Sequence, residues 1–273
     1  PPLPNAFEII CLGNELLIGK ILNSNAQWLA KNVTSLGGTV QRITVVGDDI
    51  EEIAIVLQEA LSRKSAFILT TGGLGPTFDD KTLDAVALAL KKPVELNETA
   101  FLMVKDKYHH YEKTTHKTIE LTTARVKMAH LPKDAVPLPN PIGTAPGVLS
   151  ECASSKIINL PGVPSEMKAI FKESVVPLIR CFVGNRYMYE KSLEVTEIIE
   201  SALAPLIDLV MRDYPTVYVK SHPKAAEPIP LIELHLSTFA PSQEEAKKQV
   251  EAAATKVTRL IEEYGGVIEP FTV

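Results

Sequence analysis

The sequence has few cysteines, no long apolar run and no excess of positive charge, and each shortage argues against a class of protein. Three widely spaced cysteines, Cys11, Cys152 and Cys181, form no Cys-x-x-Cys pair, so a disulfide framework or a zinc site is not expected and a reducing cytoplasm fits. No apolar run could span a membrane, and no signal peptide precedes the first predicted strand. With 28 Lys and Arg against 33 Asp and Glu, the net charge of −5 argues against a general nucleic-acid binder. We therefore expect a cytoplasmic protein that binds neither nucleic acid nor membrane.

The composition that remains is typical of a globular protein, and its pattern predicts a parallel sheet. The chain has 273 residues, 45% of them hydrophobic, which suits one large or two medium domains. Residues 7–12, 40–46 and 66–71 are typical of strands, and residues 26–33 and 50–61 of the helices between them. This alternation with short links predicts a sheet covered by helices on both faces, with ligands bound at the carboxyl ends of its strands.

The stretch 70–80, Thr-Thr-Gly-Gly-Leu-Gly-Pro-Thr-Phe-Asp-Asp, reads as the end of a strand, a glycine-rich loop and the start of a helix. Glycines leave backbone amides uncovered, and Thr77 or Asp79 could cap the helix that follows. The amides and the positive helix end then predict a phosphate site. A tight turn before a charged helix start is the alternative. The stretch 70–80 is not a Walker loop, because no Gly-Lys-Ser/Thr follows it. It is not a full dinucleotide fingerprint either, because Phe78 stands in place of the third glycine.

Four acids follow the predicted strands closely. Glu15 comes after the first strand, Asp48 after the second, and Asp79 and Asp80 after the third. Because parallel strands end at the same edge of a sheet, these carboxylates should gather on one rim. Carboxylates beside a phosphate would repel it unless a hard cation lay between the two, since such a cation takes oxygen ligands from carboxylate and phosphate together.

Further along the chain, residues 97–125 form a polar helical stretch with three histidines whose spacing makes no tidy metal site on a helix, so we expect a solvated excursion. Residues 140–147 form a second loop rich in glycine and proline. A predicted hairpin over 148–160 follows, and then a helix from about 164 to 180.

The last ninety residues show a different order of predicted strands and helices, which indicates a separate small domain. Strands at 187–195, 216–220, 231–237 and 267–269 alternate with helices at 197–211 and 243–264, a βαββαβ, ferredoxin-like order. No glycine occurs from 185 to 264, so a GxxG nucleic-acid clamp is absent there. Exposed apolar surface on this domain would support a homodimer. The expected domains are residues 6–182 and 185–273.

Five motifs together resemble the CinA family, the competence-damage-inducible type of molybdopterin-binding (MoCF) domain. In order they are Gly13-Asn14-Glu15-Leu16-Leu17, Val46-Gly47-Asp48, the 70–80 loop, residues 140–147 (Asn-Pro-Ile-Gly-Thr-Ala-Pro-Gly) and residues 160–167 (Leu-Pro-Gly-Val-Pro-Ser-Glu-Met). The resemblance covers residues 6–182, and the remainder resembles the small middle domain of longer CinA proteins. Asn14 stands where the family commonly has Thr. The 273 residues leave no room for the nicotinamide-nucleotide deamidase domain of long CinA proteins, so we expect no deamidation of nicotinamide mononucleotide.

The resemblance implies a three-layer α/β fold and metal-dependent hydrolysis of a nucleotide pyrophosphate, such as ADP-ribose, to AMP and ribose 5-phosphate. Two alternatives stay open: a molybdopterin-binding or adenylylating enzyme of molybdenum cofactor synthesis, which the resemblance also implies, and a non-catalytic nucleotide-binding module. The implied cofactor is a divalent metal, Mg²⁺ or another such as Co²⁺, with K⁺ as an additional candidate. Asp48 and Asp80 are the expected catalytic residues, and Glu15, Asp48, Asp79 and Asp80 the expected metal ligands. The residues expected to bind substrate are Gly13, Asn14, Gly72, Gly73, Leu74, Gly75, Thr77, Asn140, Gly143, Thr144 and Gly147.

Overall fold

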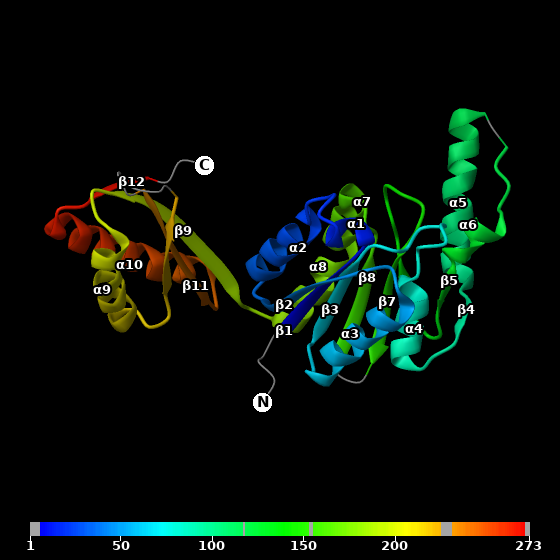
Figure 1. Cartoon of the computed structure of the whole chain (residues 1–273), viewed down its shortest axis with the longest axis horizontal. Coiled ribbons are helices and arrows are strands. Elements are labelled where there is room, and N and C mark those ends of the chain that lie inside the picture. The colour runs from blue at the N-terminus through cyan, green and yellow to red at the C-terminus, as the bar shows by residue number, and fades with distance from the viewer. Residues whose placement is uncertain (1–5, 117, 153–154, 225–230, 271–273) are drawn as a thin grey trace. The chain divides into compact units, whose positions relative to one another are not determined.

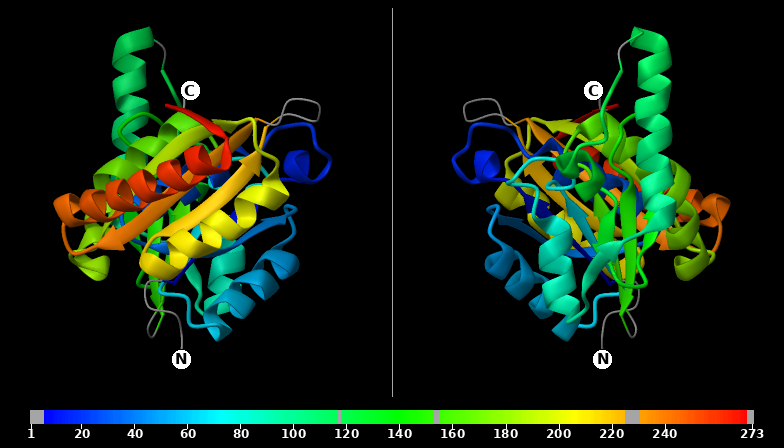
Figure 2. Two further views of the ribbon diagram at one scale, coloured as in Figure 1. Left: turned by 90° about the vertical axis from the view of Figure 1, so that its left-hand side faces the viewer. Right: turned by 90° about the vertical axis from the view of Figure 1, so that its right-hand side faces the viewer.

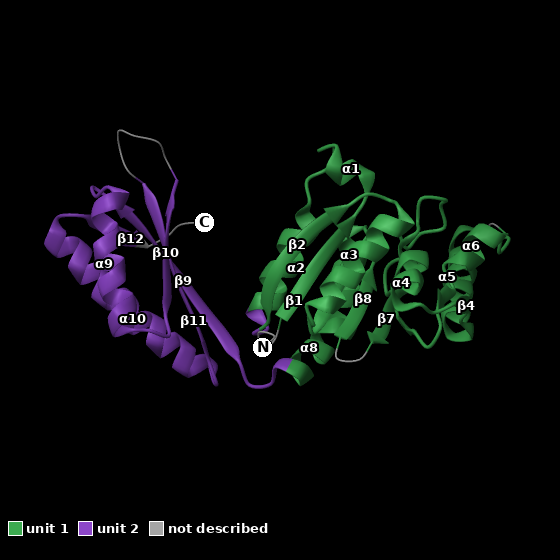
Figure 3. Ribbon diagram, turned by 60° about the horizontal axis from the view of Figure 1, so that its bottom comes forward, with its two compact units in different colours: residues 1–34, 38–182 green, residues 35–37, 183–273 purple. Residues whose placement is uncertain are grey.

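The computed structural model describes residues 6–116, 118–152, 155–224 and 231–270, and the chain divides into two compact units (Figure 3). Unit 1 comprises residues 1–34 and 38–182, and unit 2 comprises residues 35–37 and 183–273. Each unit has its own sheet, its own helices and its own core. Within the described residues, no helix has both the length and the apolar character needed to cross a membrane.

Unit 1 is built on a six-stranded sheet in the order β2-β1-β3-β8-β7-β6. Its strands are β1 (Ala6–Leu12), β2 (Thr39–Val46), β3 (Phe67–Thr71), β6 (Val136–Leu138), β7 (Gly147–Cys152) and β8 (Ser155–Leu160). The β1–β2, β1–β3 and β3–β8 pairs are parallel, whereas β7 is antiparallel to both of its neighbours. The hairpin expected over residues 148–160 is the β7–β8 pair. The predicted mostly parallel sheet is confirmed.

Helices cover both faces of this sheet (Figure 1), so the central strands β1, β3 and β8 are almost fully buried and carry mostly apolar side chains. On one face lie α3 (Ile50–Ser62) and α4 (Thr82–Leu90), which pack on Ile10, Ile68 and Ile157. On the other lie α2 (Ser24–Ser35), α7 (Pro164–Ile170) and α8 (Val176–Val183), the last two joined by a π-helical turn, Phe171–Val175. Stacked Phe7 and Phe67 rings, 4.9 Å apart, belong to that second face. The predicted three-layer fold is therefore confirmed.

Residues 91–135 leave the sheet as a helical excursion. The helix α5 (Glu98–Thr115) extends away from the sheet (Figures 1 and 2), followed by the short α6 (Thr123–Lys127). Two three-residue strands, β4 (Val94–Leu96) and β5 (His130–Pro132), pair antiparallel at its base. These two strands and β6 are not predicted from the sequence, because three residues are too few to display an alternating pattern.

The ligand-binding edge is set by the strand order. The chain leaves β1 toward β2 on one side and returns to β3 on the other, so the topology switches direction between β1 and β3. Crevices at the carboxyl ends of such neighbouring strands are the usual ligand sites of open α/β sheets. The short α1 (Asn14–Leu17) and the glycine loop follow directly after β1 and β3.

Unit 2 has a four-stranded antiparallel sheet in the order β10-β11-β9-β12. Its elements are β9 (Tyr187–Thr196), α9 (Glu200–Asp213), β10 (Tyr218–Pro223), β11 (Ile232–Ala240), α10 (Gln243–Tyr264) and β12 (Val267–Pro270). The two helices lie side by side over one face of the sheet (Figure 2), where Leu234, Leu236 and Val257 are buried. This arrangement confirms the expected βαββαβ order.

Candidate functional site

A pocket of about 500 Å³ lies at the carboxyl ends of β1, β2, β3 and β8. We call it the rim pocket. Its lining includes these predicted site residues: Gly13, Glu15, Asp48, Gly72, Gly73, Leu74, Gly75, Asp79, Asp80 and Thr144. Residues from four separate segments thus meet where the sequence predicted one rim.

Two glycines in the loop after β3 occupy positions where no side chain fits. Gly72 has a φ of +117°, and a Cβ there would lie 2.4 Å from the carbonyl oxygen of Leu12. Its amide donates to Leu160 O at 3.0 Å, so it connects the loop after β3 to the end of β8. Gly73 has a φ of +64°, and a Cβ there would lie 2.3 Å from Thr82 Oγ1. The loop is therefore held tightly against the strand ends, and it lines the pocket with backbone.

The amides of Gly73, Leu74 and Gly75 make no hydrogen bond to any residue that the structure describes. Three successive residues with unpaired donors at the edge of a pocket are typical of an anion-binding backbone. The expected contribution of the following helix is corrected. Helix α4 begins only at Thr82, whose amide already donates to Gly73 O and whose hydroxyl donates to Gly72 O.

The predicted helix caps are wrong for the same reason. The residue before α4 is Lys81, whose side chain makes no capping hydrogen bond. Thr77 and Asp79 instead belong to an irregular segment between the glycine loop and the helix. That segment positions acids at the pocket rather than starting the helix.

Asp48 is held by the loop that follows β1. Its Oδ2 accepts the amide of Asn14 at 3.0 Å, and its own amide donates to Asn14 Oδ1 at 3.4 Å. The ammonium of Lys81 donates to the carbonyl oxygen of Asp48 at 3.1 Å. The carboxylate is therefore oriented by a neutral amide, and its Oδ1 has no recorded partner among the described residues.

Thr77 organises the second acidic loop. Its amide donates to Asp80 Oδ2 at 2.8 Å, and its hydroxyl lies within hydrogen-bonding distance of both Asp79 and Asp80 carboxylates. Lys127 anchors the same loop from α6, because its ammonium donates to Thr77 O at 2.9 Å and Asp80 O at 2.6 Å. The hydroxyl of Thr77, and then the backbone of Asp79 itself, lower the pKa of Asp79, assisted by the charges of Lys127 and Lys81.

The four acids share a pocket without forming a preassembled metal cage. Among the described residues, no three His, Cys, Asp or Glu side chains are placed to hold a metal ion together. The amide of Asn14 orients the Asp48 carboxylate, and Thr77 bonds to the carboxylates of Asp79 and Asp80, so these three acids are held by local protein groups. The all-oxygen donor set nevertheless fits Mg²⁺, which commonly uses only one or two carboxylates together with substrate phosphates and water.

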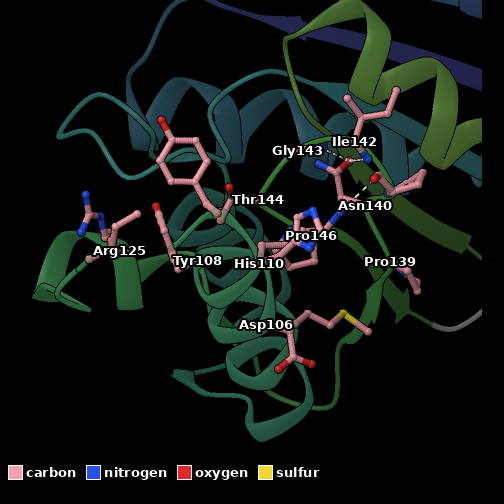
Figure 4. A pocket seen from close by; sticks show the side chains of 15 residues that line it. Asp106, Tyr108, His110, Arg125, Pro139, Asn140, Ile142, Gly143, Thr144 and Pro146 are labelled. Carbon is pink, nitrogen blue, oxygen red and sulfur yellow. Dashed lines mark hydrogen bonds between the residues drawn. The ribbon is translucent and has the colours of Figure 1, made fainter. Parts of the chain in front are cut away.

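The 140–147 loop is organised by the buried amide of Asn140. Its Nδ2 donates to Ala145 O at 2.8 Å and to Glu166 Oε2 at 2.7 Å, and its Oδ1 accepts the amides of Ile142 and Gly143 (Figure 4). A Cβ on Gly143 would meet the Glu166 carboxylate at 2.0 Å. The loop is thus rigid, and it presents Thr144 to the rim pocket.

Several predicted substrate residues lie outside the rim pocket. Asn140 and Gly143 line a neighbouring pocket, and Asn14 lines a separate hollow near Asp49 while its side chain holds the Asp48 loop. Gly147, which starts β7, lines neither, and a Cβ there would lie 3.0 Å from Ile170 Cγ2, so its role is packing. Thr77 is exposed and lines neither pocket, although its hydroxyl contacts the carboxylates of Asp79 and Asp80. Asn140, Gly143 and Thr144 share the neighbouring pocket, whereas Asn14, Thr77 and Gly147 line neither that pocket nor the rim pocket.

The rim pocket also contains residues that the sequence analysis did not assign to the site. Glu166 and Val163 come from the start of α7, Met128 follows α6, and Tyr108 comes from α5. Glu166 and Val163 had a signal, since both lie in the motif of residues 160–167. Met128 and Tyr108 come from the excursion and carry no local pattern.

Comparisons with known proteins agree with this fold. The sequence pattern of the family described as "Probable molybdopterin binding domain" matches residues 8–181. A protein from Caldivirga maquilingensis is 48% identical over 90% of this chain and 92% of its own, and one from Pyrobaculum calidifontis is 45% identical over 95% and 96%. A solved structure, the protein CinA with unknown function from Thermoplasma acidophilum, is 38% identical with a TM-score of 0.58, covering 63% of this chain and 98% of that one.

Proposed function

The chain belongs to the probable molybdopterin binding domain family and is similar to CinA, as its motifs predicted; from this premise we propose that the rim pocket binds a phosphorylated pterin of the molybdopterin type, free or adenylylated. One observation carries the proposal. The amides of Gly73–Gly75 have no partner among the described residues and lie at the edge of a pocket that a phosphate-bearing ligand can enter. Such amides bind phosphate oxygens through fixed partial charges.

The acids of the pocket require a cation beside an anionic ligand. Asp48 and Asp80 would hold Mg²⁺ together with the ligand phosphate, with Glu15 and Asp79 close to the same cavity. When bound, such an ion neutralises phosphate charge and lowers the pKa of a bound water. Lys81 and Lys127 hold the acidic loops through their carbonyl oxygens, so the cation and the ligand would meet an ordered rim.

Retention of the pterin tests this proposal. Molybdopterin released anaerobically from a molybdenum enzyme is incubated with the protein and Mg²⁺, separated by ultrafiltration, and measured as its fluorescent oxidation product. We expect the wild type and Asp208→Asn, an exposed matched change in α9, to retain it. We expect Asp80→Asn to lose it. Absence of retention, or equal retention by Asp80→Asn, would refute the proposal.

A second candidate is hydrolysis of a nucleotide pyrophosphate, and the four carboxylates in one pocket favour it. Water oxygen attacks one phosphorus of ADP-ribose and the anhydride P–O bond breaks, giving AMP and ribose 5-phosphate. Asp48 accepts the proton of water through Oδ1, since Oδ2 accepts the amide of Asn14. The comparisons favour pterin binding over this reaction, because they concern a molybdopterin-binding family and no pyrophosphatase.

Turnover separates the two candidates. The protein is incubated with ADP-ribose and Mg²⁺ or Co²⁺, with and without K⁺, and AMP is measured by chromatography. Metal-dependent AMP that disappears in Asp48→Asn supports hydrolysis. Pterin retention without AMP supports the first proposal alone.

A further inference from the structure

A second and larger pocket, of about 880 Å³, lies beside the rim pocket in unit 1 (Figure 4). We call it the α5 pocket. It lies between α5, α6 and the 139–146 loop, and residues of all three segments line it. Tyr108 and Thr144 line both pockets, so the two cavities share a boundary. A ligand held by its phosphates at the glycine loop could therefore extend into the α5 pocket.

The α5 pocket concentrates aromatic side chains in a chain that has few. Aromatic Phe, Trp and Tyr make up only 6% of the sequence, yet residues 108–111 read Tyr-His-His-Tyr. Tyr108, His110 and Tyr111 all line the pocket. The guanidinium of Arg125 lies 4.8 Å from the centroid of the Tyr108 ring. Aromatic and guanidinium planes together form surfaces on which planar rings stack.

Two of the apolar groups in this pocket remain open to solvent. Tyr111 on α5 is 56% exposed, and Ile142 on the 139–146 loop is 60% exposed. A planar ring inserted into the pocket would cover apolar surface of this kind, which is favourable. Lys107 fixes the spacing of these walls, because its ammonium donates to Pro141 O at 2.9 Å. The hydrogen bonds of Asn140 hold the loop from the other side.

We propose that the α5 pocket binds the planar heteroaromatic ring, purine or pterin, of the ligand whose phosphates lie at the Gly73–Gly75 loop. This inference rests on the proposed function and specifies how the ligand is recognised. Arg125 and Lys107 give this side of the ligand a positive environment, against Asp106 as the acid in the lining. The stretch that the sequence assigned to solvent thereby becomes the ring-binding wall.

Binding measurements by calorimetry, with Mg²⁺ present, test the ring contribution. The ring-bearing probes are AMP and 6-hydroxymethylpterin phosphate, and the ring-free probes are ribose 5-phosphate and inorganic pyrophosphate. We expect the wild type to bind one ring-bearing probe at least about tenfold more tightly than ribose 5-phosphate, as stacking on an aromatic side chain predicts. If AMP shows the larger gain in affinity the pocket prefers a purine, and if 6-hydroxymethylpterin phosphate does it prefers a pterin.

Tyr111→Ala and Tyr108→Ala should remove most of this preference, and Tyr108→Phe should retain it. Affinity for inorganic pyrophosphate should change less than about twofold in Tyr111→Ala, since that side chain lines only the α5 pocket. The matched control is Tyr264→Ala, which removes a 62% exposed ring at the end of α10. Photolabelling with 8-azido-AMP should modify residues of α5 or of the 139–146 loop.

The outcomes separate this inference from the function on which it rests. If pyrophosphate binds in an Asp80-dependent manner but the ring preference survives Tyr108→Ala and Tyr111→Ala, the inference is wrong and the phosphate site stands. Photolabelling elsewhere in the chain would also overturn it. If no phosphate probe binds while adenosine binds in a Tyr111-dependent manner, the proposed function is wrong and the ring pocket stands.

Discussion

Glu8 lies near the start of β1, and Asp48 follows the end of the neighbouring strand β2, so these acids occupy opposite ends of the same strand pair. Glu8 is 1% exposed, and its carboxylate accepts hydrogen bonds from Arg63 Nη2 at 2.7 Å, Arg63 Nε at 2.8 Å and Ser65 Oγ at 2.6 Å. Asp48 is half-buried and is oriented by the amide of Asn14. One acid is matched by a cation within the fold, and the other is oriented and left uncompensated.

The difference distinguishes an acid whose charge is neutralised within the fold from acids whose charge is left for the cation that we propose. Burial raises the pKa of Glu8, but hydrogen bonds from Arg63 and Ser65 together with the Arg63 charge lower it further, so the net shift is downward. Its charge is neutralised inside the molecule. Asp48 and Asp80 receive neutral donors, and nearby Lys81 and Lys127 bond to carbonyl oxygens instead of carboxylates. Charge at the pocket therefore remains available to a cation.

The largest expected effect concerns the buried pair. Glu8→Gln removes the charge that faces Arg63, and breaking a buried ion pair typically costs about 3 kcal/mol or more. We expect the free energy of unfolding in urea to fall by about that amount, with little change in ligand affinity. Glu59→Gln is the control, because Glu59 is 61% exposed and lies 3.5 Å from the same guanidinium. Equal losses in both variants would contradict this account.

At the other end of the sheet we expect the opposite result, a loss of ligand affinity without a loss of stability. Asp48→Asn and Asp80→Asn should each lower ligand affinity or turnover about a hundredfold, comparable to loss of one strong electrostatic contact. Stability should hold or rise, because repulsion between carboxylates is relieved. The double variant should lose less than the product of the singles, since the two act as a unit. Calorimetry and urea unfolding measure both quantities, and full affinity in both variants would show that the loop is only a turn.

A smaller effect is expected at Thr77. Thr77→Ala removes the hydroxyl shared by Asp79 and Asp80 but keeps the amide that donates to Asp80. Affinity for inorganic pyrophosphate should fall roughly tenfold, which corresponds to the net contribution of one hydrogen bond to a charged group. Thr77→Ser restores the hydroxyl and should restore binding. Failure of serine to rescue would assign the effect to packing.

The smallest effect concerns pH. Because the pKa of folded Glu8 lies below its unfolded value of about 4.3, its stabilisation is complete above that pH and is lost as pH falls through the lowered folded value. Urea unfolding between about pH 5 and pH 3 should therefore show a steeper loss in the wild type than in Glu8→Gln. Asp79→Asn should make the fall of unfolding free energy between these pH values only slightly less steep, since Asp79 is exposed. The same pH dependence of unfolding free energy in wild type and Glu8→Gln would refute this role of Glu8.

Much of this protein could be predicted from periodicity and motif. The alternation of buried strands and amphipathic helices predicted the parallel sheet, and the period-two pattern of residues 231–237 predicted a strand of the small unit. The glycines of the loop after β3 predict either backbone open to a ligand or a tight turn. The positive φ angles and close neighbours of Gly72 and Gly73 explain why glycine stands there, and ligand binding stays a prediction. Local order along the chain contains this information, since each signal spans fewer than twenty residues.

Only the tertiary structure decided which of these residues share a cavity. Asp48 and Asp80 lie 32 positions apart in sequence, and Tyr108 and Glu166 come from segments with no common pattern, yet all four line the rim pocket. Gly147 stood in the same motif as Thr144 but lies against Ile170, because β7 begins at Gly147 and places it within the sheet. The aromatic run 108–111 resembles a solvated helix until the 139–146 loop is placed opposite it. Strand ends and a helical excursion meet only when the sheet order is set, and that order depends on long-range packing that no local pattern encodes.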